Sequence, residues 1–424
     1  MPRVKIVGGG LAGLSAATAL AEAGFEVDLH EAKPFLGGRA TSYPVHPSEP
    51  DGERIDNCQH VLLRCCDNLL DFYRRLGVED KIRFYKAIHF VRPGGAVDTL
   101  ERGPLPKPLH LAGSFLRLSF LSIGEKIALI RDLRAIEVEY ARREDLDTFT
   151  FGEWLRRRGA SENVYRRFWE PIVVSALNED PEIASAKPAF QVFAEGLMGS
   201  RTSYEMGVPA VPLADLYAAA GKGVRVHLRS TVERIDPASD EADFYVSAVP
   251  FERVEALIPG LGLNLQKFTH SPITGIHLWF DRPITELPHA SLLDRTMQWM
   301  FRRGERYVQC VVSASRGLMG MKREEIIDLA VRELGEFFPE AKRAKLERAH
   351  VVKEARATYS VVPRLEVDRP GPRTKYPNVF LAGDWTDTGW PATMEGAVRS
   401  GYRAAEAVGT AVHGALEPER ALPG

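Results

Sequence analysis

The chain has 424 residues, 45% of them hydrophobic and 26% charged, a balance typical of folded globular proteins and not of disordered ones. Lys and Arg number 55 and Asp and Glu 57, which gives a formal net charge of -2. A nucleic-acid-binding protein needs a surplus of basic side chains, so we expect no nucleic acid among its partners. At about 150 residues per domain, the length predicts two to three domains.

The cysteines and the N-terminus favour a reducing compartment. Cys58, Cys65, Cys66 and Cys310 form neither a disulfide framework nor the paired spacing of a zinc site, so we expect no metal. Residues 3–7 already have the pattern of a strand, which leaves no room for a signal peptide. Because no apolar run approaches the roughly 20 residues that span a bilayer, we expect a cytoplasmic protein.

A dinucleotide-binding motif follows the first predicted strand. Gly8, Gly10 and Gly13 occupy the positions of a G-x-G-x-x-G motif, directly before a helix-forming run over 14–23. The first glycine permits the tight turn, the second lets the backbone approach a pyrophosphate, and the third lets the helix pack closely on the strand. The helix dipole then favours the negative charge.

A second strand, predicted over 26–30, ends at Glu31. This acid lies roughly 20 residues beyond Gly13, where the acceptor for a ribose hydroxyl is expected. A glycine-rich turn alone is weak support. In this context of strand, helix and acid, the motif predicts a dinucleotide site.

Two further segments resemble the flavin amine oxidase and phytoene desaturase superfamily. One is the Gly-Gly-Arg stretch at residues 37–39, where Arg39 could neutralise phosphate charge; alone it could be a surface turn. The other is a predicted strand over 378–384, which ends in Gly-Asp, followed by residues 389–401, which enter a helix. The resemblance implies FAD, with the Gly-Asp pair at its ribityl and phosphate part and the helix N-terminus facing the flavin ring.

The residues that match these motifs are expected to bind the cofactor. They are Gly8, Gly10, Leu11, Ala12, Gly13, Glu31, Ala32, Gly38, Arg39, Ala40, Asn57, Val232, Gly383, Asp384, Pro391, Thr393, Met394 and Ala397. Residues 223–228 and 231–235 are predicted to form a strand pair, and 244–250 a further strand returning to the cofactor. In the superfamily, the residue matching Val232 meets the adenine through its backbone.

These elements predict an α/β fold with two domains. The first is a discontinuous, Rossmann-like FAD-binding domain (1–75, 205–262 and 352–424), and the second an α+β substrate domain of mixed sheet and helices (76–204 and 263–351). In the second, we predict strands over 274–280 and 307–312. We predict helices there over 125–143, 150–158 (with a capping box from Thr150 to Glu153) and 322–337.

Four stretches narrow the resemblance to the hydroxysqualene dehydroxylase family: 55–63, 168–178, 276–281 and 383–386. The similarity implies reduction of a long isoprenoid, hydroxysqualene, to squalene. Cys58 stands where the family pattern has glycine, which could crowd an approach to the flavin. Because only one dinucleotide motif is present, we expect no dedicated NAD(P)H site and an external electron donor of unknown identity.

Loss of an allylic hydroxyl requires a hydride and a proton, so a general acid is needed. His60 and Asp56 are the candidates, since their loop is expected to pass beside the flavin and a carboxylate would favour a charged histidine. Alternatively, Asp56 caps a turn and His60 packs. Glu170 is a weaker candidate that could simply pair with Arg166 or Arg167.

An apolar segment over 104–123 is too short to span a bilayer. Between 101 and 134 there are six basic residues and three acidic ones, which suits either peripheral contact with the inner face of the cytoplasmic membrane or a buried helix of the substrate domain.

Two other functions stay open. A phytoene-type desaturase or an amine oxidase would run the flavin in the oxidative direction, which cofactor motifs cannot distinguish. A non-catalytic prenyl-lipid carrier on the same fold is disfavoured by the intact set of cofactor motifs.

Overall fold

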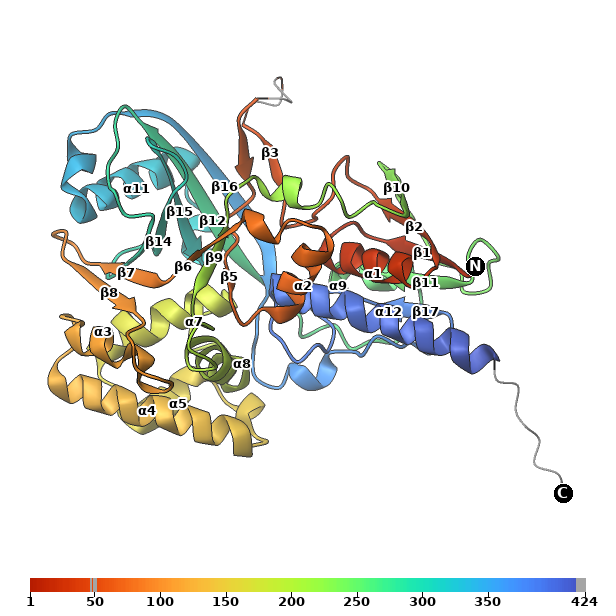
Figure 1. Ribbon diagram of the computed structural model, residues 1–424, viewed down its shortest axis with the longest axis horizontal. Coiled ribbons are helices and arrows are strands. Elements are labelled where there is room, and N and C mark those ends of the chain that lie inside the picture. Colours follow the sequence, from red (N-terminus) through yellow and green to blue (C-terminus); the bar gives the residue numbers. More distant parts are fainter. Residues whose placement is uncertain (46–47, 49–51, 417–424) are drawn as a thin grey trace.

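The computed structural model describes residues 1–45, 48 and 52–416. A parallel sheet lies beside the N-terminus, and a larger mixed sheet with a group of helices forms the opposite end of an elongated molecule (Figure 1). The long strand β16 (Leu346–Tyr359) belongs to the larger sheet and runs through the domain boundary expected at residue 352.

The first sheet contains five parallel strands. In spatial order they are β10 (Val224–Leu228), β2 (Glu26–Glu31), β1 (Arg3–Val7), β11 (Phe244–Ser247) and β17 (Val379–Leu381). Helices α1 (Leu11–Glu22) and α12 (Met394–Leu416) pack together so closely that a Cβ on Gly401 would lie 2.3 Å from the carbonyl oxygen of Ala12. This order is the predicted Rossmann-like arrangement, which gathers the carboxyl ends of β1, β11 and β17 at one edge.

The predicted strand pair of residues 223–228 and 231–235 is wrong. β10 pairs in parallel with β2 instead, and residues 231–235 form no strand. Arg229 has a positive φ of 54°, and the N–H of Ser230 donates to the carbonyl oxygen of Glu31 at 2.9 Å. The chain therefore turns at Arg229 and follows the loop after β2, because these bonds outweigh the β-branched composition of the segment.

The second sheet contains seven strands. In spatial order they are β16 (Leu346–Tyr359), β12 (His270–Phe280), β15 (Tyr307–Ser313), β14 (Trp299–Arg302), β13 (His289–Leu292), β7 (Ala87–Val91) and β8 (Val97–Glu101). All neighbours are antiparallel except β13 and β7. Helix α11 (Arg323–Phe337) buries its apolar side against one face, and Phe301 and Val311 on the other face pack against Met206 and Val208.

The helices beside this sheet are α3 (Ala112–Arg117), α4 (Ile123–Arg142), α5 (Phe151–Arg158), α6 (Glu162–Val164), α7 (Glu170–Leu177) and α8 (Ala186–Gln191), with π-helical turns at Tyr165–Trp169 and Val192–Leu197. Of these helices, α4, α5, α6 and α8 begin at a capping Ser or Thr side chain, whereas α3 and α7 have no side-chain cap. The predicted capping box of Thr150 and Glu153 is present, and Gly159 ends α5 with a φ of 71°.

The remaining elements connect the two sheets. They are β3 (Ser42–Pro44), β4 (Arg54–Asp56), β5 (Leu62–Leu63), β6 (Ile82–Tyr85), β9 (Met206–Pro209), α2 (Asp67–Arg75), α9 (Phe251–Leu257) and α10 (Arg316–Met319). Short 3-10 turns lie at Glu79–Lys81, Leu109–Leu111, Leu146–Thr148, Leu213–Leu216, Pro339–Lys342 and Glu366–Asp368. Within the described ranges, no helix combines the length and the apolar character needed to cross a bilayer.

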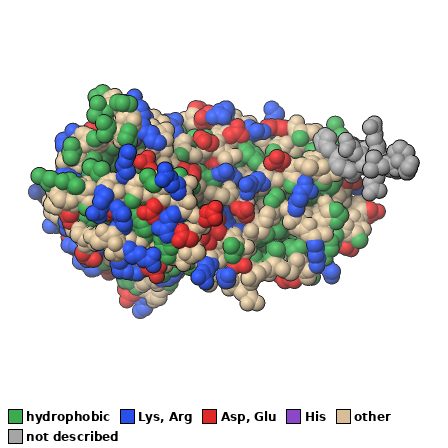
Figure 2. Space-filling model, turned by 90° about the horizontal axis from the view of Figure 1, so that it is seen from below, with side chains coloured by type: hydrophobic (Ala, Val, Ile, Leu, Met, Phe, Trp, Pro, Cys, Tyr) green, Lys and Arg blue, Asp and Glu red, His purple; other side chains and the backbone are tan. Residues whose placement is uncertain are grey.

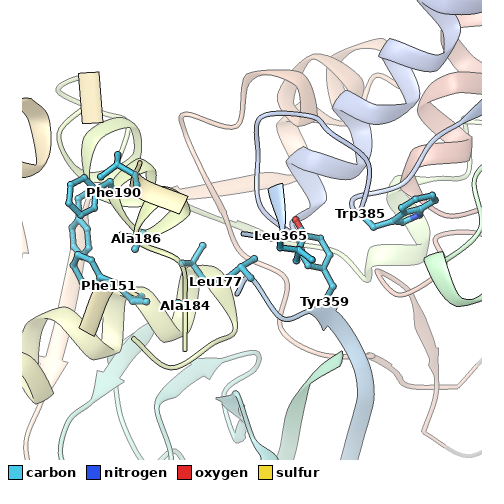
Figure 3. Packing of buried hydrophobic residues seen from close by; sticks show 14 of the residues in the cluster. Phe151, Leu177, Ala184, Ala186, Phe190, Tyr359, Leu365 and Trp385 are labelled. Carbon is cyan, nitrogen blue, oxygen red and sulfur yellow. The ribbon is translucent and has the colours of Figure 1, made fainter. Parts of the chain in front are cut away.

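One hydrophobic cluster joins the helices to the cofactor side of the molecule. It begins with the rings of Phe151 and Phe190 and continues through Leu177 to Tyr359 and Trp385 (Figure 3). Burial of such rings is the main source of stability in a core. The helices and the C-terminal loop that carries Trp385 are therefore held by the same packing.

Candidate active site

The glycine-rich turn after β1 leaves space at the start of α1. Gly8 has a φ of 113°, and a Cβ on Gly13 would lie 1.8 Å from the carbonyl oxygen of Gly8, so both positions require glycine. A Cβ on Gly10, in contrast, would meet only the Cα of Gly38, at 3.9 Å. Helix α1 begins at Leu11 with no side-chain cap. Its first-turn N–H groups therefore face an open position suited to a pyrophosphate.

The carboxylate of Glu31 holds the loops on both sides of this turn. Its Oε2 accepts from the N–H of Gly9 at 2.7 Å, and its Oε1 accepts from the N–H of Lys33 at 2.8 Å. The hydrogen bond from Ser230 to the Glu31 carbonyl places Val232 two residues further along the same path. The contacts expected from Glu31 and Ala32 to the ribose and from Val232 to the adenine stay predictions.

Arg39 joins the two ends of the chain. Its Nη2 donates to Oδ1 of Asp384 at 2.7 Å, and its Nη1 donates to the carbonyl oxygen of Ala357 at 2.9 Å. Burial opposes the charge of Arg39, but the adjoining Asp384 carboxylate outweighs it and raises the guanidinium pKa above its usual value. The sequence suggested a phosphate as the partner of Arg39; its partner in this structure is Asp384.

The loop between β17 and α12 is fixed by small polar groups. The N–H of Gly383 donates to Oγ of Ser400 at 2.8 Å, and Gly383 itself has a φ of 148°. Oγ1 of Thr393 accepts from the N–H of Gly396 at 3.1 Å, which satisfies one free donor at the start of α12. Pro391, Met394 and Ala397 therefore lie at the start of this helix, and Asp384 follows the glycine that is bonded to it.

A cavity of about 330 Å³ lies where these segments meet. Its walls come from three separate parts of the chain, and its lining comprises Lys33, Phe35, Gly38, Arg39, Thr41, Tyr43, Asn57, Pro250, Phe251, Glu252, His270, Glu354, Arg356, Tyr359, Asp384 and Trp385. Nδ2 of Asn57 donates to the carbonyl oxygen of Arg39 and to Oε2 of Glu354, both at 3.1 Å. The cavity thus contains four residues expected to bind the cofactor: Gly38, Arg39, Asn57 and Asp384.

The contribution of β16 to this cavity was missed by the sequence analysis. Glu354, Arg356 and Tyr359 come from this strand, which was divided between two predicted domains. Arg356 lies 3.4 Å from the carboxylate of Glu252. No local sequence signal marks these residues, because only the pairing of β16 with β12 carries them to the cofactor side.

Asp56 is fixed by donors on both carboxylate oxygens. Its Oδ1 accepts from Oγ of Ser42 at 2.7 Å and from the N–H of Leu213 at 3.0 Å. Its Oδ2 accepts from Nη2 of Arg303 at 2.9 Å, and the side chain of Asp56 is only 2% exposed. These contacts give Asp56 a structural role in joining the β3–β4 hairpin to its neighbours.

His60 is partly buried beside a backbone carbonyl group. Its Nδ1 lies 2.8 Å from the carbonyl oxygen of Cys58, and because a carbonyl only accepts, Nδ1 carries the proton. Burial lowers the pKa of His60 and outweighs the opposing effects of this hydrogen bond and of Asp56. The nearby carboxylate of Asp56 does favour the charged form, as expected, but burial outweighs this effect.

Glu170 begins helix α7, on an element that contributes no residue to the cavity. Burial and the neighbouring Asp180 carboxylate raise its pKa above the usual value. Neither suggested partner pairs with it: Arg166 lies 3.8 Å from Glu162, and Arg167 lies 2.8 Å from Asp294.

Asn178, the last residue of the stretch 168–178 that resembles the family, has a structural role. The side chain of Asn178 donates to the carbonyl oxygen of Ser271 and accepts from the N–H of Ala314 at 2.7 Å, which fastens α7 to the second sheet.

Cys58 fits without a clash because a glycine faces it. Its Sγ lies 3.7 Å from the position that a Cβ on Gly275 would occupy. Burial raises the pKa of the Cys58 thiol, so it is uncharged. The side chain is thus accommodated against β12, and the crowding expected at this position is relieved on that side.

The sheet face that Cys58 contacts carries buried polar atoms that lack hydrogen-bond partners in the part of the chain that the structure describes. Gln309 pairs across the strands with His277, two residues from Gly275, so both point to the same face as Gly275. Neither Oε1 nor Nε2 of Gln309 has a hydrogen-bond partner among the described residues, and the same is true of Nε2 of His277. Such groups are costly when buried unless another molecule satisfies them.

The fold and cavity together define a dinucleotide-dependent protein with a second sheet bounding its cofactor site. The sequence model of flavin-containing amine oxidoreductases matches residues 11–409, and the chain belongs to this family. It is a flavin-dependent oxidoreductase, and FAD is its cofactor. This family assignment disfavours a non-catalytic carrier.

Individual relatives carry several names. The chain is 31% identical to hydroxysqualene dehydroxylase of Rhodopseudomonas palustris, over 96% of this chain and 98% of the relative. It is 28% identical to a probable zeta-carotene desaturase of Synechococcus elongatus, with the same coverage. Two solved structures share the fold: a putrescine oxidase triple mutant (16% identity, TM-score 0.72, covering 96% and 99% of the two chains) and cyclohexylamine oxidase from Brevibacterium oxydans (18%, 0.71, 97% and 99%).

Proposed function

We propose that this protein reduces a long isoprenoid allylic alcohol, hydroxysqualene, to squalene. The observation that carries the proposal is the buried polar face around Gln309, on the side of the second sheet that faces Cys58. The similarity to hydroxysqualene dehydroxylase over nearly the full length supports the same substrate class.

The residues around the cavity fit the cofactor that this reaction needs. Gly8, Gly10 and Gly13 leave the start of α1 open to a pyrophosphate, while Arg39 and Asp384 close the cavity from the two chain ends. Reduced FAD supplies the hydride that replaces the hydroxyl. The protein has to position the alcohol, exclude water and deliver one proton to the departing hydroxyl.

Gln309 is suited to position a hydroxyl group. Its carboxamide offers one acceptor and two donor hydrogens, and a substrate hydroxyl, which both donates and accepts, would satisfy it. Phe301 and Val311 on the same face supply apolar surroundings for a hydrocarbon chain. A carotenoid hydrocarbon, in contrast, carries no group that would satisfy the amide.

We propose His60 as the proton donor, ahead of Asp56 and Glu170. The oxygens of Asp56 are already occupied, and Glu170 lies on an element that contributes no residue to the cavity. His60 does not line the cavity either, but it lies on the same loop as Asn57, which does. Because the pKa of His60 is lowered, only a minority of molecules carry the extra proton at neutral pH, so turnover should rise as the pH is lowered from neutral. His60→Ala should slow turnover at least ~100-fold with FAD still bound; an unchanged rate would remove His60 from the mechanism.

A carotenoid desaturase is the second candidate, because such enzymes match with similar identity and coverage. The direction of electron flow separates the two. In an anaerobic experiment, photoreduced protein is mixed with hydroxysqualene, and flavin oxidation is followed together with squalene by mass spectrometry. Squalene formed in step with flavin oxidation supports the proposal. Reduction of the oxidised protein by phytoene or zeta-carotene, with no reaction of hydroxysqualene, would favour the desaturase.

We also propose that substrate enters from a membrane surface through the segment around α3 and α4. Phe115, Leu118 and Leu121 of this segment are buried, as expected for a helix of the substrate domain. Other large apolar side chains, here called the apolar ridge, are 48–78% exposed: Leu105, Leu109, Leu116, Ile123, Ile127 and Ile130. The segment therefore has a buried side, as expected for a helix of the substrate domain, and an exposed apolar side, which would suit contact with a membrane. Flotation with liposomes tests the contact.

A further inference from the structure

A second cavity lies at the end of the molecule that carries the apolar ridge. Its volume is about 560 Å³, and its lining comprises Arg92, Pro93, Ala96, Arg166, Arg167, Asp294 and Arg295. These residues come from the β7–β8 turn, the π-helical turn before α7 and the turn after β13. Four arginines thus face one carboxylate, in a place where no part of the proposed reaction occurs.

Some arginines of this cavity form close ion pairs with carboxylates, and others do not. Arg167 pairs with Asp294 at 2.8 Å, and Arg295 pairs with Glu336 at 2.6 Å. Arg166, in contrast, lies 3.8 Å from Glu162, and both side chains are largely exposed, at 59% and 80%. An exposed pair at this distance contributes little. Arg166 is therefore free to bind an anion.

Arg92 is also incompletely satisfied. Its Nη2 donates to Oγ of Ser119 at 2.6 Å and lies 3.4 Å from Oδ2 of Asp98. Its Nε is buried and has no hydrogen-bond partner among the described residues. Arg92 therefore keeps one unused donor, and an incompletely paired guanidinium in a basic cavity favours an oxyanion ligand, because its planar donors match phosphate oxygens.

Hydrogen bonds connect the residues of this cavity and their neighbours to the segment that carries the apolar ridge. Ser119, which binds Arg92, lies between α3 and α4, both of which carry ridge residues. Three residues before Arg166, Nδ2 of Asn163 donates to the carbonyl oxygen of Phe120 and to the carboxylate of Glu125 in the first turn of α4. Ile123 in the same turn is 78% exposed. Figure 2 shows hydrophobic and basic side chains interspersed at this end.

We propose that this arginine cavity binds the phosphodiester headgroup of an anionic phospholipid while the apolar ridge contacts the acyl region. The inference rests on the membrane contact proposed above and adds a lipid preference to it. The arrangement of a basic cavity beside an exposed apolar surface provides both elements of interfacial binding, apolar burial and attraction to anionic headgroups. No bond is formed or broken in this step.

The test compares two double variants of the full-length, FAD-loaded protein. Arg166→Ala with Arg295→Ala removes two arginines from the cavity. The control, Arg282→Ala with Arg343→Ala, also removes two surface arginines. Arg282 follows β12 and pairs with Asp281, and Arg343 lies after α11 and pairs with Glu340. Binding is measured by flotation with vesicles of phosphatidylcholine alone and with vesicles that also contain phosphatidylglycerol, at one ionic strength.

Each basic side chain near an anionic surface contributes about fivefold to affinity. The cavity variant should therefore bind phosphatidylglycerol vesicles about 25-fold more weakly and phosphatidylcholine vesicles as before, while the control variant matches the wild type. Equal losses in both variants, or an unchanged lipid preference in the cavity variant, would overturn the proposal.

Two further results would also reject it. Absence of wild-type binding to either vesicle removes the membrane contact, while the photoreduction experiment still reports separately on the reaction. Saturable binding of inorganic phosphate or glycerol 1-phosphate, lost in the cavity variant and without a vesicle preference, would identify a soluble phosphate as the ligand instead.

Discussion

Gly10 gives the most direct test of the cofactor-binding turn after β1. The fold does not require glycine at this position, whereas a bound pyrophosphate would need the space that a side chain would fill. Its φ of -77° and ψ of -179° are accessible to any residue. A Cβ there meets only the Cα of Gly38 within 4 Å. Gly10→Val should therefore leave the protein folded and fill the position expected for the pyrophosphate.

The magnitude follows from these contacts. Loss of a favourable N-cap glycine costs about 1 kcal/mol, and restriction of the unfolded chain returns about 0.4–1 kcal/mol, so the apoprotein should unfold at nearly the wild-type temperature. Overpacking costs about 1–3 kcal/mol, which corresponds to an FAD dissociation constant raised about 5- to 150-fold. The assay is titration of apoprotein with FAD, monitored by flavin fluorescence, together with thermal unfolding of the apoprotein.

Two other glycines provide controls. A Cβ on Gly317 also meets open space but lies on α10, away from the cavity, so Gly317→Val should leave FAD affinity unchanged. Gly13→Ala should instead destabilise the apoprotein itself, because its Cβ would overlap the carbonyl oxygen of Gly8 at 1.8 Å. Wild-type FAD affinity in Gly10→Val would show that the pyrophosphate does not lie beside Gly10.

Other side chains give further predictions. Gln309→Leu should raise the free energy of unfolding by about 1 kcal/mol, because it removes two unpaired buried polar atoms, while turnover of the alcohol falls; a less stable variant with normal turnover would contradict this. Burial lowers the pKa of His289 to about 4, so the unfolded chain binds more protons below pH 6.5 and stability falls on acidification. His289→Gln should reduce that slope between pH 6 and 4 by about 1.4 kcal/mol per pH unit in denaturant titrations; an unchanged slope argues against a neutral His289. Arg303→Met should cost about 3–5 kcal/mol, because it leaves Asp56 buried and unpaired; a loss below about 1 kcal/mol in the same titrations would show that the pair is effectively solvated.

The N-terminal part of the cofactor site could be predicted from sequence because its signals are local. The strand, glycine turn and helix around Gly8 to Gly13 depend on neighbours in the chain, and so does the capping box at Thr150. Residues 231–235 show the limit of such signals. Their β-branched composition predicts a strand, but hydrogen bonds to the loop after β2 decide the conformation.

Long-range pairing explains what the sequence could not provide. Glu354 reaches the cavity only through the register of β16 against β12, and Arg39 meets Asp384 from the opposite end of the chain. The lowered pKa of His60 depends on burial, which a motif does not encode. For the 104–123 segment, the sequence left two alternatives open because exposed and buried apolar residues alternate within it.

We infer that the two ends of the chain together hold FAD against the second sheet. The most direct measurement is reconstitution of Arg39→Ala, Asp384→Ala and wild-type apoprotein with FAD, followed by the flavin absorbance retained after gel filtration. We predict one FAD per wild-type chain and a large loss in both variants. Full retention of FAD by both variants, or no uptake by the wild type, would contradict it.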